Sequence, residues 1–148
     1  MADKNSANDT VMLLQECDAG IKMAVSAIDD VIDNVEDKNF RNLLSDSKSQ
    51  HEIMKAEVTT LLNEHGGDGK EPSVMAKGMS WAKTNMKMAV DGNDSTIADL
   101  ITDGCNMGVK SLNGYLNEYK NADGKSKGVT NRLVKLEQTL ATNIRQFL

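Results

Sequence analysis

The length, composition and charge of the chain restrict what it can be. With 148 residues it has the right size for one domain with a buried core. Aromatic residues make up 3% of it and proline occurs once, which favours an all-α chain over a sheet protein. The net charge of −5 argues against a nucleic-acid partner, because such proteins carry a basic stripe. No apolar run approaches the roughly 18 residues that cross a membrane.

The start of the chain and its cysteines indicate a compartment. The polar N-terminus has no apolar signal-peptide core, and two cysteines are too few for a disulfide framework. We therefore expect a cytoplasmic protein without a transmembrane segment.

The first part of the chain predicts a helical hairpin, residues 9–65. Asp9 or Thr10 caps a first helix that runs to about residue 34, after eight frayed residues. A turn leads into a second helix, which ends before Gly66 and Gly67. Apolar residues recur every three or four positions in both helices, as they do on the buried face of a helix. These stripes are Val11, Leu14, Ile21, Val25, Ile28 and Ile32, then Phe40, Leu43, Leu44, Met54, Val58, Leu61 and Leu62.

Residues 74–90 predict a separate helix with a methionine-rich face. Its lysines project elsewhere, so one interpretation is a basic helix that contacts an anionic membrane or a partner. The interpretation that we prefer is a crossover helix whose apolar face packs on the bundle and partly shields Trp81. A helix of about 16 residues spans roughly 24 Å, enough to return the chain along most of a bundle. The next helix would then run parallel to the second.

The last part predicts a second hairpin, residues 94–148. Asp94 or Ser95 caps its first helix, which runs to about residue 121, and residues 121–127 form a turn. Three glycines inside the helix cost about 1 kcal/mol each, so we expect a neighbouring helix to approach closely there. They are Gly104, Gly108 and Gly114. The final helix carries an apolar stripe of Val129, Leu133, Leu136, Leu140, Ile144 and Phe147.

A short repeat links the two hairpins. Cys17-x-x-Gly20 is followed by Ile and Lys, and Cys105-x-x-Gly108 by Val and Lys, each in the first helix of its pair. Between them stand the Leu-x-x-x-Gly-Gly ending at residues 62–67 and the Gly-x-x-Trp of residues 78–81. In this order the motifs resemble a family of uncharacterised bacterial ferritin-like proteins, a domain of unknown function. The resemblance covers residues 10–145. It implies one domain over residues 1–148, a ferritin-like four-helix bundle with an additional crossover helix, and no settled activity.

The acidic residues fit the metal centre of such bundles poorly. A di-iron site takes a carboxylate from each of two helices and a Glu-x-x-His from each of the other two. Both candidate motifs here lack the histidine, and Lys55 would bring a positive charge to the site. We expect three acids to lie beside the apolar stripes, as solvated or boundary residues. The acids considered are Glu16 or Asp18, together with Glu52, Asp103 and Glu137.

A second set of polar residues falls on the core face. Asp18 and His51 lie at similar levels of the first hairpin, so we expect them to form a satisfied buried pair. Cys17 and Cys105 are interpreted as small apolar core residues. The alternative is a metal or redox site made by the two cysteines and the histidine. Neither a catalytic triad nor a phosphate loop is indicated.

These observations predict a non-enzymatic bundle protein without a cofactor, which acts structurally, through an unknown protein partner or by self-association. The alternative is a metal-binding or oxidative-stress ferritin-like protein. Its degenerate site would lie around Asp18, His51 and Glu137 and take iron or zinc.

Overall fold

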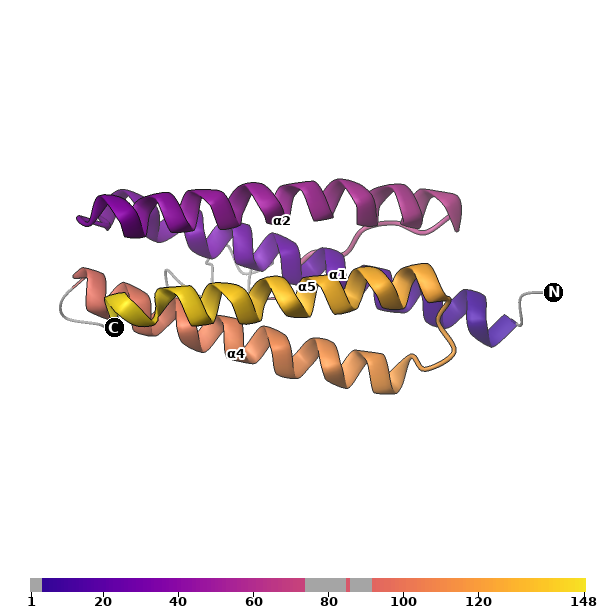
Figure 1. The fold of residues 1–148 in the computed structure, drawn as a ribbon. Helices are drawn as coiled ribbons and strands as arrows, with labels where there is room; N and C mark the ends of the chain where they lie inside the picture. The colour runs from indigo at the N-terminus through magenta and orange to yellow at the C-terminus, as the bar shows by residue number, and fades with distance from the viewer. Residues whose placement is uncertain (1–3, 74–84, 86–91) are drawn as a thin grey trace.

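The computed structural model describes residues 4–73, 85 and 92–148. Throughout these residues the regular structure is helical, with four long helices arranged side by side (Figure 1). The helices are α1 (Lys4–Val31), α2 (Lys38–Glu64), α4 (Asp94–Glu118) and α5 (Gly124–Asn143), with short 3₁₀ turns at Ile32–Asn34 and Ile144–Phe147. The predicted all-α bundle is confirmed for the described residues. The crossover helix expected at 74–90, with Trp81 and its methionine face, lies outside the described residues apart from residue 85.

The order of the helices is that of two antiparallel hairpins. The helix α1 pairs with α2 and α4 pairs with α5, while α1 also packs beside α4 and α2 beside α5. Figure 1 shows α2 and α4 running in the same direction, from the end that holds the C-terminus towards the opposite end. This parallel arrangement confirms the expectation from the length of the connecting segment, since a short loop would have made α2 and α4 antiparallel.

The first helix begins earlier than expected, at Lys4, and neither predicted cap serves it. Both side chains instead bind the turn between α4 and α5. An oxygen of Asp9 accepts a hydrogen bond of 3.0 Å from the backbone N–H of Asn121, and the hydroxyl of Thr10 accepts one of 2.9 Å from that of Asp123. The side chains of Asp9 and Thr10 therefore accept hydrogen bonds from backbone N–H groups of a distant turn, and not from those at the start of their own helix.

The start of α4 shows a similar exchange of roles. Asn93 is the N-cap and accepts from the backbone N–H of Thr96. The carboxylate of Asp94, one of the two predicted caps, instead accepts hydrogen bonds of 2.8 Å from the backbone N–H groups of Glu36 and Asp37. This contact fastens the first turn of α4 to the α1–α2 connection.

The glycine ending of α2 is confirmed. Gly66 has a φ of 66°, in the left-handed region that favours glycine. The N–H of Gly66 donates to the carbonyl of Asn63 and that of Gly67 to the carbonyl of Leu62. Together these bonds form a Schellman motif, which satisfies carbonyls at the helix end.

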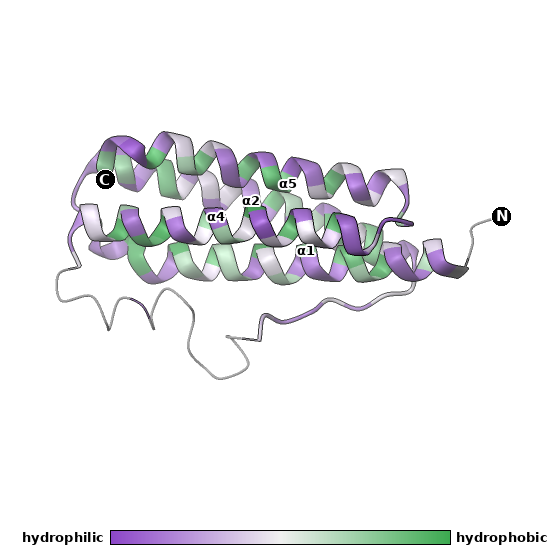
Figure 2. Ribbon diagram, turned by 90° about the horizontal axis from the view of Figure 1, so that it is seen from below, coloured by the Kyte–Doolittle hydropathy of each residue, from purple (hydrophilic) through white to green (hydrophobic). Residues whose placement is uncertain are grey.

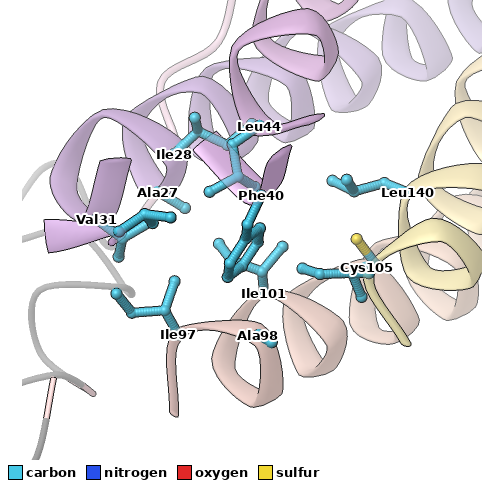
Figure 3. Packing of buried hydrophobic residues seen from close by; sticks show 12 residues of the cluster. Ala27, Ile28, Val31, Phe40, Leu44, Ile97, Ala98, Ile101, Cys105 and Leu140 are labelled. Carbon is cyan, nitrogen blue, oxygen red and sulfur yellow. The ribbon is translucent and has the colours of Figure 1, made fainter. Parts of the chain in front are cut away.

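The core consists of two apolar clusters separated along the bundle. Apolar residues recur between polar ones along each helix, as Figure 2 shows. At one end Phe40 lies among side chains of α1 and α4 (Figure 3). It stacks on Phe147 with ring centroids 4.6 Å apart. At the other end Leu14 and Cys17 of α1 pack with apolar residues of α2, α4 and α5. Between the clusters, α2 and α5 each carry buried polar residues.

The close helix approach expected at the glycines of α4 is absent at two of them. Among the described residues, a Cβ atom on Gly114 would meet nothing within 4 Å, and one on Gly108 would make an ordinary contact of 3.7 Å with Glu137. The neighbour of Gly108 is therefore a side chain at normal distance, and Gly114 has open space.

Candidate functional site

The most unusual feature of the interior is a polar bridge between α2 and α5. His51 is fully buried and the residue Glu137 is 7% exposed. Nε2 of His51 binds Oε1 of Glu137, while Nδ1 lies 2.7 Å from the carbonyl oxygen of Ser47 on the preceding turn. The predicted pair of His51 with Asp18 is wrong, because both ring nitrogens of His51 are bound to other groups.

The partners of His51 determine how the ring is protonated. A carbonyl oxygen only accepts, so Nδ1 carries a hydrogen and donates it to Ser47. Burial by itself lowers the pKa of His51, but the hydrogen bond and negative charge of Glu137, with the Ser47 carbonyl, outweigh it and raise the pKa above its ordinary value. The bridge therefore favours an imidazolium that donates from both nitrogens to a carboxylate and a carbonyl.

Glu137 corrects the expectation for the acidic residues. Glu52 and Asp103 are exposed, as predicted, but Glu137 lies on the buried face of α5. The buried stripe is Val129, Leu133, Glu137, Leu140 and Ile144, whose spacing of four, four, three and four is regular for a helix. Leu136, which the sequence interpretation placed on the stripe, lies on its flank and is half-buried. The stripe through Leu136, with spacings of four, three, four and four, is equally regular, so periodicity alone did not distinguish Glu137 from its apolar neighbour.

Cys105 lies against the bridge, on α4. Burial raises the pKa of its thiol, and the negative charge and hydrogen bond of Glu137 raise it further. The thiol is thereby kept protonated and weakly nucleophilic. In Figure 3, Cys105 lies beside Leu140 at the edge of the Phe40 cluster.

Cys17 lies in the other core cluster, away from this site. Its sulfur is 3.2 Å from the hydroxyl of Thr130 on α5, and burial raises the pKa of its thiol to about 11. Both cysteines are buried and unpaired, which agrees with their interpretation as core residues. The structure does not bring Cys17, Cys105 and His51 together as one site.

Asp18, on α1, binds the segment that follows α2. It is 2% exposed, accepts a hydrogen bond of 2.9 Å from the backbone N–H of Lys70, and forms an ion pair of 2.8 Å with Lys22. Lys22 also donates to Glu71 at 2.9 Å. These bonds hold the segment that follows α2 against α1. Asp18 is therefore the anchor of a loop, and it does not join His51 and Glu137.

The residues present do not fit the di-iron centre of ferritin-like bundles. Both nitrogens of His51 already hold hydrogen bonds, and Glu52 and Asp103 face solvent. Among the residues that the structure describes, no group of three or more His, Cys, Asp and Glu side chains is placed to hold a metal ion. The candidate residues thus divide into a bridge of His51 and Glu137 with Cys105 beside it, a loop anchor, and an isolated thiol.

Comparisons with known proteins agree with this fold. A crystal structure of Dps92 from Deinococcus radiodurans superposes with a TM-score of 0.78 at 11% identity, over 97% of this chain and 87% of that one. A conserved hypothetical protein from Mycobacterium tuberculosis gives a TM-score of 0.64 at 15% identity, over 99% of each chain. The chain shares the ferritin-like fold with these proteins, and identities this low show the fold alone. No protein-family profile and no curated protein sequence matches the chain.

None of the described helices is both long and apolar enough to cross a bilayer.

Proposed function

We propose that this protein is a non-enzymatic ferritin-like bundle that acts as a scaffold, through a protein partner or by self-association. The observation that carries the proposal is the bridge between α2 and α5. His51 spends both of its nitrogens on contacts within the bundle. A histidine that serves as a metal ligand must present a free nitrogen lone pair to the ion. Here the polar interior connects helices, as a structural role requires.

Elemental analysis of the purified protein tests this proposal against the metal-binding alternative. We expect the protein to carry much less than one equivalent of iron, zinc or manganese after exposure to each metal and removal of the excess. The variant His51→Leu/Glu137→Leu should remain helical and unchanged in metal content. Glu52→Gln is the matched control, because Glu52 is an exposed acid on the same helix as His51. Stoichiometric metal that is lost on replacing His51 and kept by the control would overturn the proposal.

A place for a partner contact lies on the outer face of α2 and α5. Ile53 is 70% exposed, beside a shallow groove that Met54 and Leu136 help to line. Lys135 and Arg132, which pairs with Glu57, also line the groove. If this face mediates self-association, sedimentation velocity will show assembly that increases with concentration and is lost in Ile53→Lys. If the protein stays monomeric at all concentrations, self-association is excluded, and only the form of the proposal with a different protein partner is kept.

A further inference from the structure

A cavity of about 340 Å³ lies between α1 and α4 and reaches α5. This volume is within the range of small-molecule sites, which begins at roughly 300 Å³. Among the described residues, its walls are mainly apolar and small. They include Ala24, Ala27 and Ile28 from α1, Ile101 from α4, and Leu133 and Leu140 from α5. Such walls accommodate an aliphatic or aromatic body.

The same cavity is lined by Glu137 and Cys105, so it extends to the polar bridge. Oε1 of Glu137 is bound to His51. A Cβ atom on Gly108 would lie 3.7 Å from Oε2 of Glu137, and Gly108 itself lines the cavity. Because residue 108 has no side chain, it leaves space in front of the second carboxylate oxygen. A carboxylate has about four acceptor positions, so the hydrogen bonds with His51 and with the thiol of Cys105 leave it able to accept more.

The charges around the cavity define the kind of ligand. The lining contains three carboxylates, Glu16, Glu71 and Glu137, and one ammonium, Lys70. At the rim Lys70 binds Glu16, and Lys22 binds Glu71. Glu137 is the acid that adjoins the apolar walls, and it is paired through Oε1 with His51 on its other side. A buried carboxylate accepts a hydrogen bond from a charged donor more strongly than from a neutral one, and a carboxylate ligand has no hydrogen to donate to it.

We propose that this cavity binds a small primary ammonium compound with an apolar body, whose N–H group donates to Glu137. This inference is independent of the scaffold role, because a bundle without metal or activity can still hold a ligand. Three probes with the same chain length separate the contribution of the head group from that of the aliphatic body: hexylammonium, hexan-1-ol and hexanoate. They share the aliphatic body and differ in the head group that would reach the carboxylate.

Ligand-observed NMR titration of the full chain with each probe is the test. We expect saturable binding of hexylammonium at one site, binding of hexan-1-ol at least about tenfold weaker, and no binding of hexanoate. Absence of saturable hexylammonium binding would overturn the proposal, and so would equal affinities for the three probes.

Two variants and a control locate the site. Gly108→Leu places a side chain in front of Glu137 and should abolish binding of hexylammonium. Glu137→Gln keeps the shape of the side chain and should reduce the preference for hexylammonium over hexan-1-ol to less than about threefold. Glu52→Gln, on the exposed face of α2, should bind like the wild type. Circular dichroism confirms folding of each variant, and wild-type binding by a folded Gly108→Leu protein would contradict the proposed location.

Discussion

Replacing His51 by leucine tests how much the bundle depends on its polar bridge. The substitution keeps a bulky side chain at a fully buried position, so loss of packing is small compared with the electrostatic change. It leaves the buried carboxyl of Glu137 without the donor that now binds Oε1. Removing one partner of a buried ion pair typically costs about 3–5 kcal/mol. Glu137 also borders the cavity, where water can reach it, so we expect a loss of about 3 kcal/mol in the free energy of unfolding.

The reciprocal change should cost less. In Glu137→Leu the ring of His51 can lose its Nε2 proton and still donate from Nδ1 to the Ser47 carbonyl. One uncharged ring nitrogen is then left without a partner, for which we expect a loss of about 1–2 kcal/mol. In the double variant, two leucines face each other between the apolar clusters. Its stability should lie within about 1 kcal/mol of the wild type, because replacing a buried pair by apolar groups is often neutral.

Urea unfolding, followed by the helical circular dichroism signal at neutral pH, measures the four proteins of this cycle. We expect the single losses to exceed the loss in the double variant by about 2 kcal/mol or more. The exposed pair of Arg132 and Glu57 provides the control, because such pairs contribute about 0–1 kcal/mol. Additive losses at His51 and Glu137, or a His51→Leu loss below about 0.5 kcal/mol, would refute this reasoning.

Three further predictions follow from the same structure. Because the pKa of His51 is raised in the folded state, its stabilisation is fully present below the ordinary histidine value of 6.5 and is lost as pH rises through the raised pKa. Between about pH 6 and pH 9, urea unfolding should therefore show the wild type losing more stability than the double leucine variant. Gly69→Ala should destabilise the protein by about 1–3 kcal/mol, because the new Cβ would lie 2.7 Å from a carboxylate oxygen of Asp18. Gly114→Ala should stabilise it by up to about 1 kcal/mol, because no described residue lies near the new Cβ. Thermal unfolding of the two variants measures both effects. Cys17 is a buried thiol with a raised pKa and does not line the cavity, so a thiol reagent should label it only after denaturation, and rapid labelling of Cys17 in the native protein would contradict the burial.

Much of the fold followed from patterns that are local in the sequence. The apolar periods predicted the four described helices, because a helix must bury one face whatever it packs against. Gly66 and Gly67 marked the end of α2, since the left-handed backbone there is a property of those residues themselves. The parallel course of α2 and α4 followed from chain geometry, because the connecting segment is long enough to return along the bundle.

The features that were missed depend on contacts between distant segments. Asp9, Thr10 and Asp94 have the composition of helix caps, yet each accepts hydrogen bonds from the backbone of another connection. A local pattern shows that such a side chain can bind a free N–H group, but only the fold shows which N–H group is near. Asp18 was recognised as buried, and its partner Lys70 lies in a loop whose path could not be read from periodicity.

Glu137 was misplaced for a different reason. An acid was assumed to avoid the buried stripe, and the neighbouring leucine was chosen to continue it. That assumption holds for an isolated carboxyl, because burying an unpaired charge is costly. It fails when another helix supplies a partner, as His51 of α2 does. The helical period in α5 is equally regular through Leu136 and through Glu137, so the base on the facing helix, and not the period, decides which of them is buried.

The outcome of the leucine replacements also bears on the cavity. If the double variant with leucine at residues 51 and 137 is as stable as the wild type, the bundle does not need the bridge of His51 and Glu137 for its stability. Its remaining physical consequences are a carboxylate fixed at the floor of an apolar cavity and an imidazolium that holds it in place. A leucine at residue 137 would leave the fold intact but remove the acceptor that distinguishes an ammonium from an alcohol of the same length. Stability and ligand selectivity should therefore separate in the double variant, which folds like the wild type and loses its preference among the three probes.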